Sequence, residues 1–291
     1  MGMTRVLVLG SSGRIGRMLR QAWALDSLRT PNADIELVFQ TRQADQNRPE
    51  DLRWDILREP PQAVEEAARF DCMIVLSGVV PGPEVDFTLN TAIGTACVTA
   101  AAQLGIPHVL LASTSAVYGT GSDDPFSEDD PLDPANDYGR SKRDMEAACH
   151  ALAAELGVGL CCLRIGNVAG ADALLINGAA LAPDEKLRLD TFKDGGTPVR
   201  SYIGPQSLAR VMLSLVRNRT QLPAALNIAA PHAITMGALA QAAQMPLELH
   251  LARDSAHQYV TLDCGVLETL HRFDPTETHP SEMVRQWHML R

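Results

Sequence analysis

Residues 5–16 read Arg5-Val-Leu-Val-Leu-Gly-Ser-Ser-Gly-Arg-Ile-Gly16. Their apolar run is continuous, as expected for a strand that is buried on both faces of a parallel sheet. After the glycine turn, apolar residues recur at helical spacing from Ile15 to Trp23. Strand, glycine turn and amphipathic helix together predict the opening βαβ unit of a nucleotide-binding sheet.

The glycine turn is the first candidate binding site. Glycine lets the backbone approach a pyrophosphate, whose negative charge is stabilised at the N-terminus of the following helix. A glycine turn without any ligand is the alternative, but the buried strand before it and the amphipathic helix after it favour dinucleotide binding. The residues assigned to this site are Gly10, Ser12, Gly13, Arg14, Ile15 and Gly16.

Strand and helix patterns alternate along the rest of the chain. Strand patterns occupy residues 35–39, 71–76, 108–112, 159–164, 225–228 and 247–251, with a weaker one ending near 54–55. Helical patterns occupy residues 62–69, 87–104, 138–156, 206–216 and 236–243, with another near the C-terminus. The alternation predicts an α/β fold with a doubly wound parallel sheet of the Rossmann type. We expect a dinucleotide-binding domain over residues 1–166 and a smaller C-terminal substrate lobe over residues 167–291, interleaved with the sheet.

A second candidate site lies between residues 112 and 142. Hydroxyl groups end an apolar strand in Ala112-Ser-Thr-Ser-Ala-Val-Tyr-Gly119, and the later segment Tyr138-Gly-Arg-Ser-Lys142 sets a phenol and an amine on one face of a helix. A free tyrosine has a pKa near ~10, so it is a poor base at neutral pH unless a nearby cation stabilises its phenolate. Tyr138 is therefore interpreted as the proton-transfer residue, Lys142 as the group that lowers its pKa, and Thr114 as the residue that holds a substrate oxygen. Taken alone, Tyr138 could instead be an aromatic residue that packs on the sheet.

With these motifs in place, the chain resembles the extended short-chain dehydrogenase/reductase family, which includes NAD-dependent sugar-nucleotide epimerases and dehydratases. The resemblance extends over nearly the whole chain. It rests on the glycine spacing, Asn90-Thr-Ala-Ile-Gly-Thr95, Ala112 to Gly119, Glu128, Tyr138 to Lys142, Glu146 and Arg164-Ile-Gly-Asn167.

The resemblance implies an enzyme that exchanges hydride between a substrate carbon and a nicotinamide while Tyr138 exchanges the proton on oxygen. It places Thr114 at the catalytic Ser/Thr position, with Ser113 or Ser115 as substitutes, and implies that Lys142 also bonds the nicotinamide ribose. Epimerase, dehydratase and reductase remain open, although Ser115-Ala116 lacks the acid that a dehydratase commonly needs. The resemblance further suggests a homodimer through the helices that begin at Phe87 and Tyr138.

Cofactor choice depends on the end of the second strand. An NAD-specific site usually has an acid there, whereas this chain reads Gln40-Thr41-Arg42. Arg42 could pair with a 2′-phosphate, helped by Arg14, so within NAD(P) we favour NADP; the alternative is that both are solvated surface arginines. The resemblance assigns Asp55 to the adenine amine and Ser77-Gly78 to the cofactor.

Substrate recognition is assigned by the resemblance to Asn167 and Arg200, which match positions that hold a nucleotide diphosphate, and to Ser115 beside the reacting group. The planar guanidinium suits phosphate oxygens. However, Gly204-Pro-Gln-Ser207 replaces the family's His-Val-Asp-Asp-like run. Arg200 could therefore be a structural arginine, and the substrate is expected to be a sugar nucleotide or a related small molecule.

Composition narrows the remaining classes. A formal charge of −10 argues against nucleic acid or an anionic membrane as the main partner. Six cysteines without CxxC spacing and eight scattered histidines suggest buried free thiols and no metal site. Without a leader or a long apolar run, the chain is expected to be cytoplasmic. The rival from another class is a non-catalytic NAD(P)-binding regulatory or scaffold protein, whose expected mark would be a broken set of Thr114, Tyr138 and Lys142.

Overall fold

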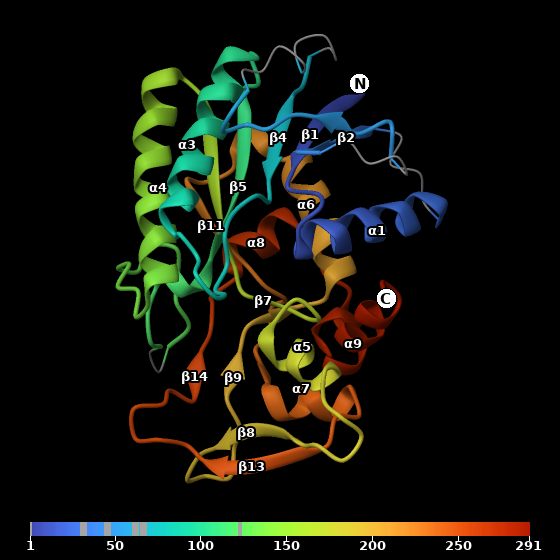
Figure 1. The fold of residues 1–291 in the computed structure, drawn as a ribbon, viewed down its shortest axis with the longest axis vertical. Coiled ribbons are helices and arrows are strands. Elements are labelled where there is room, and N and C mark those ends of the chain that lie inside the picture. Colours follow the sequence, from blue (N-terminus) through green and yellow to red (C-terminus); the bar gives the residue numbers. More distant parts are fainter. Residues whose placement is uncertain (1, 30–33, 44–47, 60–63, 65–68, 122–123) are drawn as a thin grey trace. The chain divides into compact units, whose positions relative to one another are not determined.

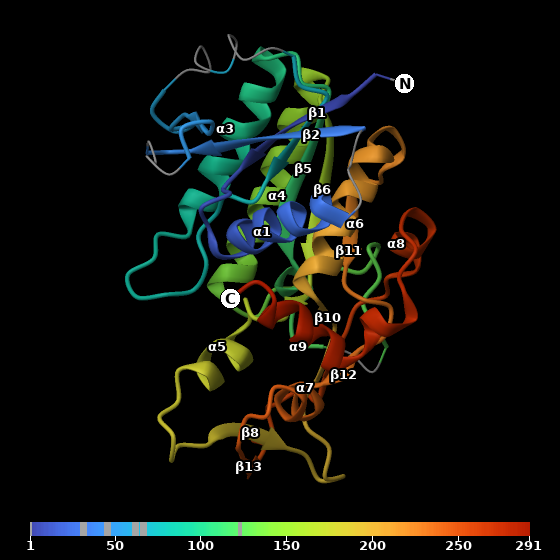
Figure 2. The same cartoon turned by 90° about the vertical axis from the view of Figure 1, so that its right-hand side faces the viewer.

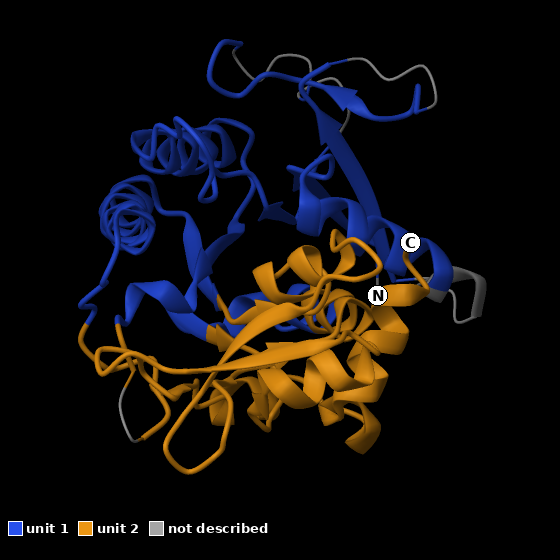
Figure 3. Cartoon of the chain, turned by 60° about the horizontal axis from the view of Figure 1, so that its bottom comes forward, with its two compact units in different colours: residues 1–119, 132–164, 213–226 blue, residues 120–131, 165–212, 227–291 orange. Residues whose placement is uncertain are grey.

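The computed structural model describes residues 2–29, 34–43, 48–59, 64, 69–121 and 124–291. The chain divides into two compact units, which Figure 3 colours separately. Unit 1 comprises residues 1–119, 132–164 and 213–226, and unit 2 comprises residues 120–131, 165–212 and 227–291. The chain therefore passes between the units several times, and one of these points, between residues 164 and 165, lies close to the expected boundary at 166.

A seven-stranded sheet in the order β11-β6-β5-β4-β1-β2-β3 contains the predicted strands apart from residues 247–251, which belong to a separate two-stranded sheet. The pairs β1–β2, β1–β4, β4–β5 and β2–β3 are parallel, which confirms the expected parallel sheet. The strand that contains Val6, Leu7 and Val8 lies inside the sheet and is covered on both faces, so all three side chains are fully buried. The strands are β1 (Thr4–Leu9), β2 (Ile35–Thr41), β3 (Leu52–Arg53), β4 (Cys72–Val75), β5 (His108–Thr114), β6 (Gly159–Ile165) and β11 (Ala225–Ile228).

Helices cover both faces of this sheet, as expected for a doubly wound fold. Figures 1 and 2 show α3 (Thr88–Gln103) and α4 (Asp137–Leu156) side by side on one face, with α1 (Arg14–Arg29) on the other. The two neighbours pack closely, since a Cβ added to Gly94 of α3 would lie 2.7 Å from the Cys149 sulfur of α4. Small residues along α3 thus bring α4, and the side chains that it carries, near the sheet.

Local sequence sets both ends of α4. The Asn136 side chain accepts a hydrogen bond from the Gly139 N–H at 2.8 Å, which caps the first turn. Gly157 ends the helix in the left-handed region with φ of 70°. These caps place Tyr138 in the first turn of α4, and Lys142 follows one turn later.

The helices and strands of unit 2 are mostly shorter than those of unit 1. Residues 172–189, whose sequence pattern is irregular, include a short helix and the start of a strand. The predicted C-terminal helix is preceded by a separate short helix, and the two are divided where Asp274 and Glu277 form a capping box. The helix predicted over 62–69 lies mostly outside the described residues. The remaining elements are β7 (Asn167–Val168), α5 (Ala173–Ala179), β8 (Leu187–Thr191), β9 (Val199–Arg200), β10 (Tyr202–Ile203), α6 (Pro205–Arg217), β12 (Ile234–Thr235), α7 (Met236–Ala242), β13 (Leu247–Leu251), β14 (Tyr259–Val260), α8 (Gly265–Leu270) and α9 (Pro280–His288), of which α6 runs on into unit 1.

Candidate functional site

The glycine turn is held against the end of β4. Gly10 has φ of +81°, and a Cβ there would lie 2.5 Å from the Ser77 nitrogen. A Cβ at Gly16 would lie 2.1 Å from the Gly10 carbonyl oxygen. Because any larger residue would collide with backbone at both positions, the turn requires glycine and keeps its backbone open to a ligand.

A pocket of about 410 Å³ lies beside this turn, within unit 1. Among the residues that line it are seven that the sequence predicted, namely Gly10, Ser12, Gly13, Arg42, Asp55, Ser77 and Gly78. Arg14 is exposed, and neither it, Ile15 nor Gly16 lines this pocket. The folded chain thus brings the turn together with the ends of β2, β3 and β4, as a dinucleotide site requires.

Sequence reasoning missed other residues of the pocket, above all the role of Gln40. Its amide nitrogen donates to the Trp54 carbonyl, and its oxygen accepts from the Gly10 N–H at 3.4 Å. Gln40 therefore connects β2 to the glycine turn at the position where an acid was expected. The other missed lining residues are Ile56, Leu57, Arg58, Leu76, Val79, Leu89 and Ile93.

Thr114 and Tyr138 meet at the carboxyl end of β5. The Thr114 hydroxyl oxygen accepts from the Ala116 N–H at 3.2 Å and caps the 3₁₀ turn Ser115–Val117. The same hydroxyl lies close enough to the Tyr138 phenol to lower its pKa, against the larger effect of burial. The Phe87 ring packs on the other side, with its centroid 6.0 Å from that of Tyr138. A hydroxyl and a phenol are thereby paired at the edge of the sheet where parallel-sheet proteins bind ligands.

Lys142 is buried, with 4% of its surface exposed. The amine donates to the Ala112 carbonyl at 2.9 Å. A Cβ added to Gly78, which lines the pocket, would lie 3.2 Å from the same nitrogen. Lys142 therefore connects the end of β5 to the pocket. Burial lowers the pKa of Lys142 to about 8, although Cys162 and Glu146 act to raise it.

The pKa of Tyr138 shifts in the opposite direction to the sequence-based expectation. Burial raises the pKa, and the neighbouring Thr114 hydroxyl offsets only part of that rise. Lys142 is not among the groups that shift this pKa, so the lowering expected from it stays a prediction. The half-buried phenol loses water, while the Lys142 amine is directed at the Ala112 carbonyl.

Asn90 is a further residue that was not assigned to the site. Its side-chain oxygen accepts from the Val79 N–H at 2.9 Å, and its amide donates to the Val79 carbonyl at 3.2 Å and to the Ser141 hydroxyl at 3.0 Å. Asn90 thus fixes the Gly78–Val79 backbone against α4. The segment from Asn90 to Thr95 carried the family resemblance, so its signal was present in the sequence.

A buried ion pair between Glu146 and Arg164 lies next to the end of β5 that carries Ser113 and Thr114. The Glu146 carboxylate accepts from the Ser113 hydroxyl and lies 3.0 Å from a guanidinium nitrogen of Arg164. Arg164 also donates to the Tyr118 phenol at 2.9 Å. These bonds join α4, β5 and β6. They also engage Ser113 away from the pocket, which leaves Thr114 as the hydroxyl beside Tyr138.

The remaining predicted substrate residues belong partly to unit 2. Ser115 is half-buried in the turn after Thr114, in unit 1. Asn167 pairs with Tyr202 in the parallel β7–β10 ladder. Arg200 donates to the Val199 and Gln258 carbonyls at 2.7 Å each and to the His257 carbonyl at 3.2 Å, and burial lowers its pKa. These bonds orient the guanidinium without neutralising it.

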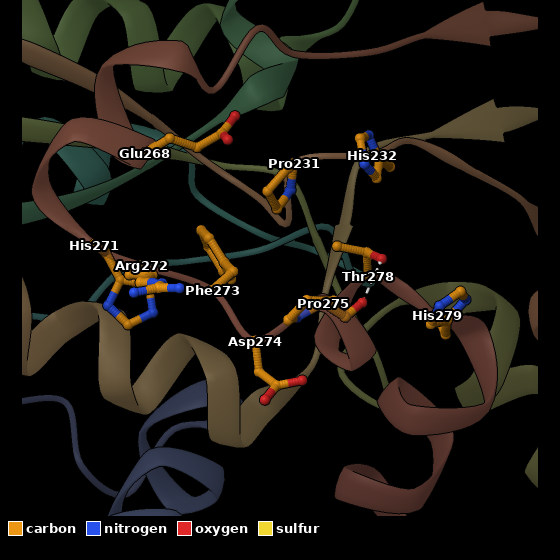
Figure 4. Close-up of a pocket in the computed structure, with 10 residues that line it drawn as sticks. All are labelled: Pro231, His232, Glu268, His271, Arg272, Phe273, Asp274, Pro275, Thr278 and His279. Atoms are coloured by element: carbon orange, nitrogen blue, oxygen red, sulfur yellow. Dashed lines mark hydrogen bonds between the residues drawn. The ribbon is translucent and has the colours of Figure 1, made fainter.

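Unit 2 also has a pocket of its own, of about 510 Å³, shown in Figure 4. It contains none of the predicted site residues, and the Thr278 hydroxyl in it is bonded to the Pro275 carbonyl at 2.9 Å. Its lining residues are Pro231, His232, Glu268, His271, Arg272, Phe273, Asp274, Pro275, Thr278 and His279. Within the described part of the chain, no group of three or more His, Cys, Asp or Glu side chains is arranged to hold a metal ion, and no helix has the length and apolar character needed to span a membrane.

Comparison of sequences finds UDP-glucose 4-epimerases. The chain is 37% identical over 109 residues to that of Azospirillum brasilense, which is 38% of this chain and 31% of the relative. It is 27% identical over 232 residues to that of Streptococcus mutans, which is 70% of this chain and 69% of the relative. The match thus spans about a third of the length of the first of these curated relatives.

Comparison of structures supports the fold over the whole chain. The UDP-Glc/GlcNAc 4-epimerase from Campylobacter jejuni has a TM-score of 0.78 at 20% identity, covering 99% of each chain. The Thermus thermophilus UDP-glucose 4-epimerase in complex with NAD has a TM-score of 0.74 at 21% identity, covering 98% of this chain and 99% of that one. A family model matches residues 6–229, which is more than half of the chain. Together with the glycine turn and the Thr114–Tyr138–Lys142 group in the same unit, this match establishes that the chain belongs to the NAD dependent epimerase/dehydratase family.

Proposed function

We propose that the protein is an NAD(P)-dependent enzyme that transfers hydride at a hydroxyl or carbonyl carbon of a sugar nucleotide or a related small molecule, with Tyr138 as the acid/base. One observation carries this proposal. The Tyr138 phenol lies beside the Thr114 hydroxyl, close enough for that hydroxyl to lower its pKa, and the buried Lys142 amine reaches from α4 toward Gly78 in the same unit. The names of the relatives support the sugar-nucleotide class, and the family name supports the nicotinamide cofactor.

The residues present fit a dinucleotide. The glycine turn forms a cradle that a Cβ at Gly10 or Gly16 would fill, and Arg42, Asp55 and Gly78 line the adjoining pocket. When bound, the nicotinamide would accept hydride from the substrate and return or release it. Ser12, just before α1, would hold the pyrophosphate, and Gly10 and Gly13, whose own N–H groups are bonded to Gln40 and Gly10, would let the backbone approach it.

Three side chains would carry out the proton transfer at the substrate oxygen. Thr114 would hold the substrate oxygen, and Tyr138 would remove or return the proton on that oxygen. The Lys142 ammonium would favour the phenolate by its positive charge, which opposes the effect of burial on Tyr138. Acid–base catalysis of this kind typically contributes about 10²- to 10⁴-fold to the rate. Ser115 would contact the substrate near the reacting group.

Substrate phosphates are assigned to Asn167 and Arg200. Arg200 is oriented by three backbone carbonyls, which accept hydrogen bonds but carry no full negative charge. Its positive charge therefore remains available to an anion, and a diphosphate suits a guanidinium. The relatives' names make UDP-glucose the first substrate to test.

The experiment is to incubate the protein with UDP-glucose and NAD or NADP, and to follow epimerisation by chromatography and reduction of the cofactor by absorbance. Tyr138→Phe keeps the aromatic ring but removes the hydroxyl, so turnover should fall by about 10²- to 10⁴-fold. Cofactor affinity measured by calorimetry should be nearly unchanged. If Tyr138→Phe turns over as fast as the native chain, the acid/base assignment is wrong. A native chain that binds the cofactor but turns over none of a panel of sugar nucleotides and small carbonyl compounds would favour the regulatory or scaffold alternative.

Cofactor preference is proposed from Gln40 and Arg42. Gln40 stands where an NAD site usually has an acid, and its amide is bonded to Trp54. Arg42 lines the pocket, so we propose that it receives a 2′-phosphate and favours NADP. Arg42→Ala should weaken NADP binding by about 10-fold, or 1.4 kcal/mol, and NAD binding much less. Arg14→Ala is the matched control, because Arg14 is exposed and does not line this pocket. Equal losses for both cofactors would contradict the assignment.

A further inference from the structure

Strand β13 of unit 2 has a free edge. It pairs in parallel with β8, with Leu247 opposite Leu187 and Leu251 opposite Thr191. Two flanking hydrogen bonds show which residues of β13 bond to β8. The Leu187 N–H donates to the Pro246 carbonyl, and the Ala252 N–H donates to the Thr191 carbonyl. Even-numbered residues of β13 therefore bond to β8, and the N–H and C=O groups of residues 247, 249 and 251 point away from it. Among the described residues, no other strand pairs with this edge.

The leucines of β13 are unusually exposed. Leu249 is 51% and Leu251 72% exposed, whereas Leu187 and Leu189, on the same face of β8, are 7% and 6% exposed. On the face of this two-stranded sheet that carries the leucines, the β8 side chains are thus buried, whereas Leu249 and Leu251 of β13 are exposed to solvent. Figure 1 shows β13 beside β8, toward the lower end of the view. An exposed apolar strand with unpaired backbone groups is a template for pairing with another strand.

The polar side chains on the other face of β13 are complementary to one another, and the positive charge there comes from Arg188 of β8, whose Nε donates to the His250 ring at 3.2 Å. Glu248 and His250 are separated by one residue, with their side-chain atoms 3.3 Å apart. If two copies of the sequence Leu247-Glu-Leu-His-Leu251 are placed antiparallel around Leu249, each Glu248 stands opposite His250 of the second copy. Each Leu247 then stands opposite Leu251 of the second copy. A carboxylate opposite an imidazole and beside the Arg188 guanidinium stabilises such a pair, whereas two carboxylates opposite each other would destabilise it.

We propose that β13 pairs antiparallel with β13 of a second copy of this chain, around a twofold axis that passes by Leu249. The backbone pattern agrees with this register. Residues 247, 249 and 251 have outward N–H and C=O groups and would form the hydrogen-bonded pairs, while 248 and 250 would form the non-hydrogen-bonded pairs, in which side chains approach more closely. A twofold axis makes the contact self-complementary and closed.

This contact is separate from the homodimer that the family resemblance suggests through the helices beginning at Phe87 and Tyr138. β13 belongs to unit 2, and both of those helices belong to unit 1. The strand pairing also does not depend on the proposed enzymatic activity, because β13 contains none of the predicted site residues. A chain that used both contacts would assemble beyond a dimer.

The register is tested by disulfide formation. In Leu249→Cys, the two new cysteines would face each other with Cα atoms about 5.5 Å apart, which a disulfide can bridge. In Leu251→Cys, the matched control, the two cysteines would be about 14 Å apart, which a disulfide cannot span. The native cysteines are buried and should not compete. Under mild oxidation we expect most of Leu249→Cys, but not Leu251→Cys, to run as a covalent dimer on a non-reducing gel.

A second variant tests the pairing without a new bond. Leu249→Pro removes an outward N–H but none of the bonds to β8, so it should lower self-association in analytical ultracentrifugation while unit 2 stays folded. Val266→Lys, an exposed apolar position on α8, is the control for a general loss of surface hydrophobicity. Circular dichroism checks the fold of each variant. Cross-linking that is equal in Leu249→Cys and Leu251→Cys, or absent from both, would overturn the proposal.

Discussion

Two arginines with partly or fully buried side chains, one in each unit, are held in different ways. Arg164 of unit 1 is bonded to the Glu146 carboxylate, so its charge is neutralised inside the protein. Arg200 of unit 2 is bonded to three backbone carbonyls, and none of the described carboxylates lies within ion-pair distance of it. A carboxylate partner makes an arginine structural, whereas carbonyl partners orient it and leave its charge for an anion. The same residue type therefore supports the fold in one region and suits a ligand in the other.

The largest effect should follow from breaking the buried pair. Glu146→Ala would leave the Arg164 guanidinium, 6% exposed, without its carboxylate. We expect a loss of about 3–5 kcal/mol in the free energy of unfolding, measured by urea denaturation. The double variant Glu146→Leu with Arg164→Met should recover part of this loss, because no charge is then buried. A cost for Glu146→Ala no greater than that for Arg200→Ala would break the comparison.

Lys142 combines the two kinds of partner that distinguish Arg164 from Arg200, since its amine donates to the Ala112 carbonyl and is also influenced by the Glu146 carboxylate. Its pKa is about 8 in the folded protein and about 10.5 in the unfolded chain. The unfolded chain then binds more protons between these pH values, so stability should rise with pH by about 1.4 kcal/mol per unit above pH 8. Urea denaturation of the cofactor-free protein at pH 7 and 9.5 measures this rise relative to Lys142→Met. Parallel pH dependence in both chains would show that Lys142 is not the cause.

The smallest effect on stability is expected at Arg200. Arg200→Ala removes bonds to carbonyls and should cost about 1 kcal/mol in the free energy of unfolding. Its effect on binding should be larger, about 10-fold or more in the affinity for UDP measured by calorimetry. Arg200→Lys retains the charge but not the planar fork, so it should recover only part of the affinity. Unchanged UDP affinity in Arg200→Ala would make Arg200 a structural arginine.

Local patterns in the sequence were sufficient for the fold and for placing the glycine turn and the Tyr138–Lys142 helix face of the candidate site. The run from Arg5 to Gly16 predicted a buried strand, a tight turn and a helix, because each depends on residues close together in the chain. The spacing of Tyr138 and Lys142 predicted one helix face for the same reason. Membership of the family followed from several such segments occurring in order.

Tertiary structure alone decided the points that depend on residues far apart in sequence. Burial, set by packing around α4 and β5, raised the pKa of Tyr138 where spacing suggested that Lys142 would lower it. The Ser113 hydroxyl is bonded to Glu146, so Thr114 is the hydroxyl beside Tyr138. Gln40, which stands where an NAD site usually has an acid, is bonded to the Trp54 carbonyl and so has a structural role that the sequence did not indicate. Desolvation and long-range hydrogen bonds have no signature in local spacing, because they exist only once distant segments are brought together.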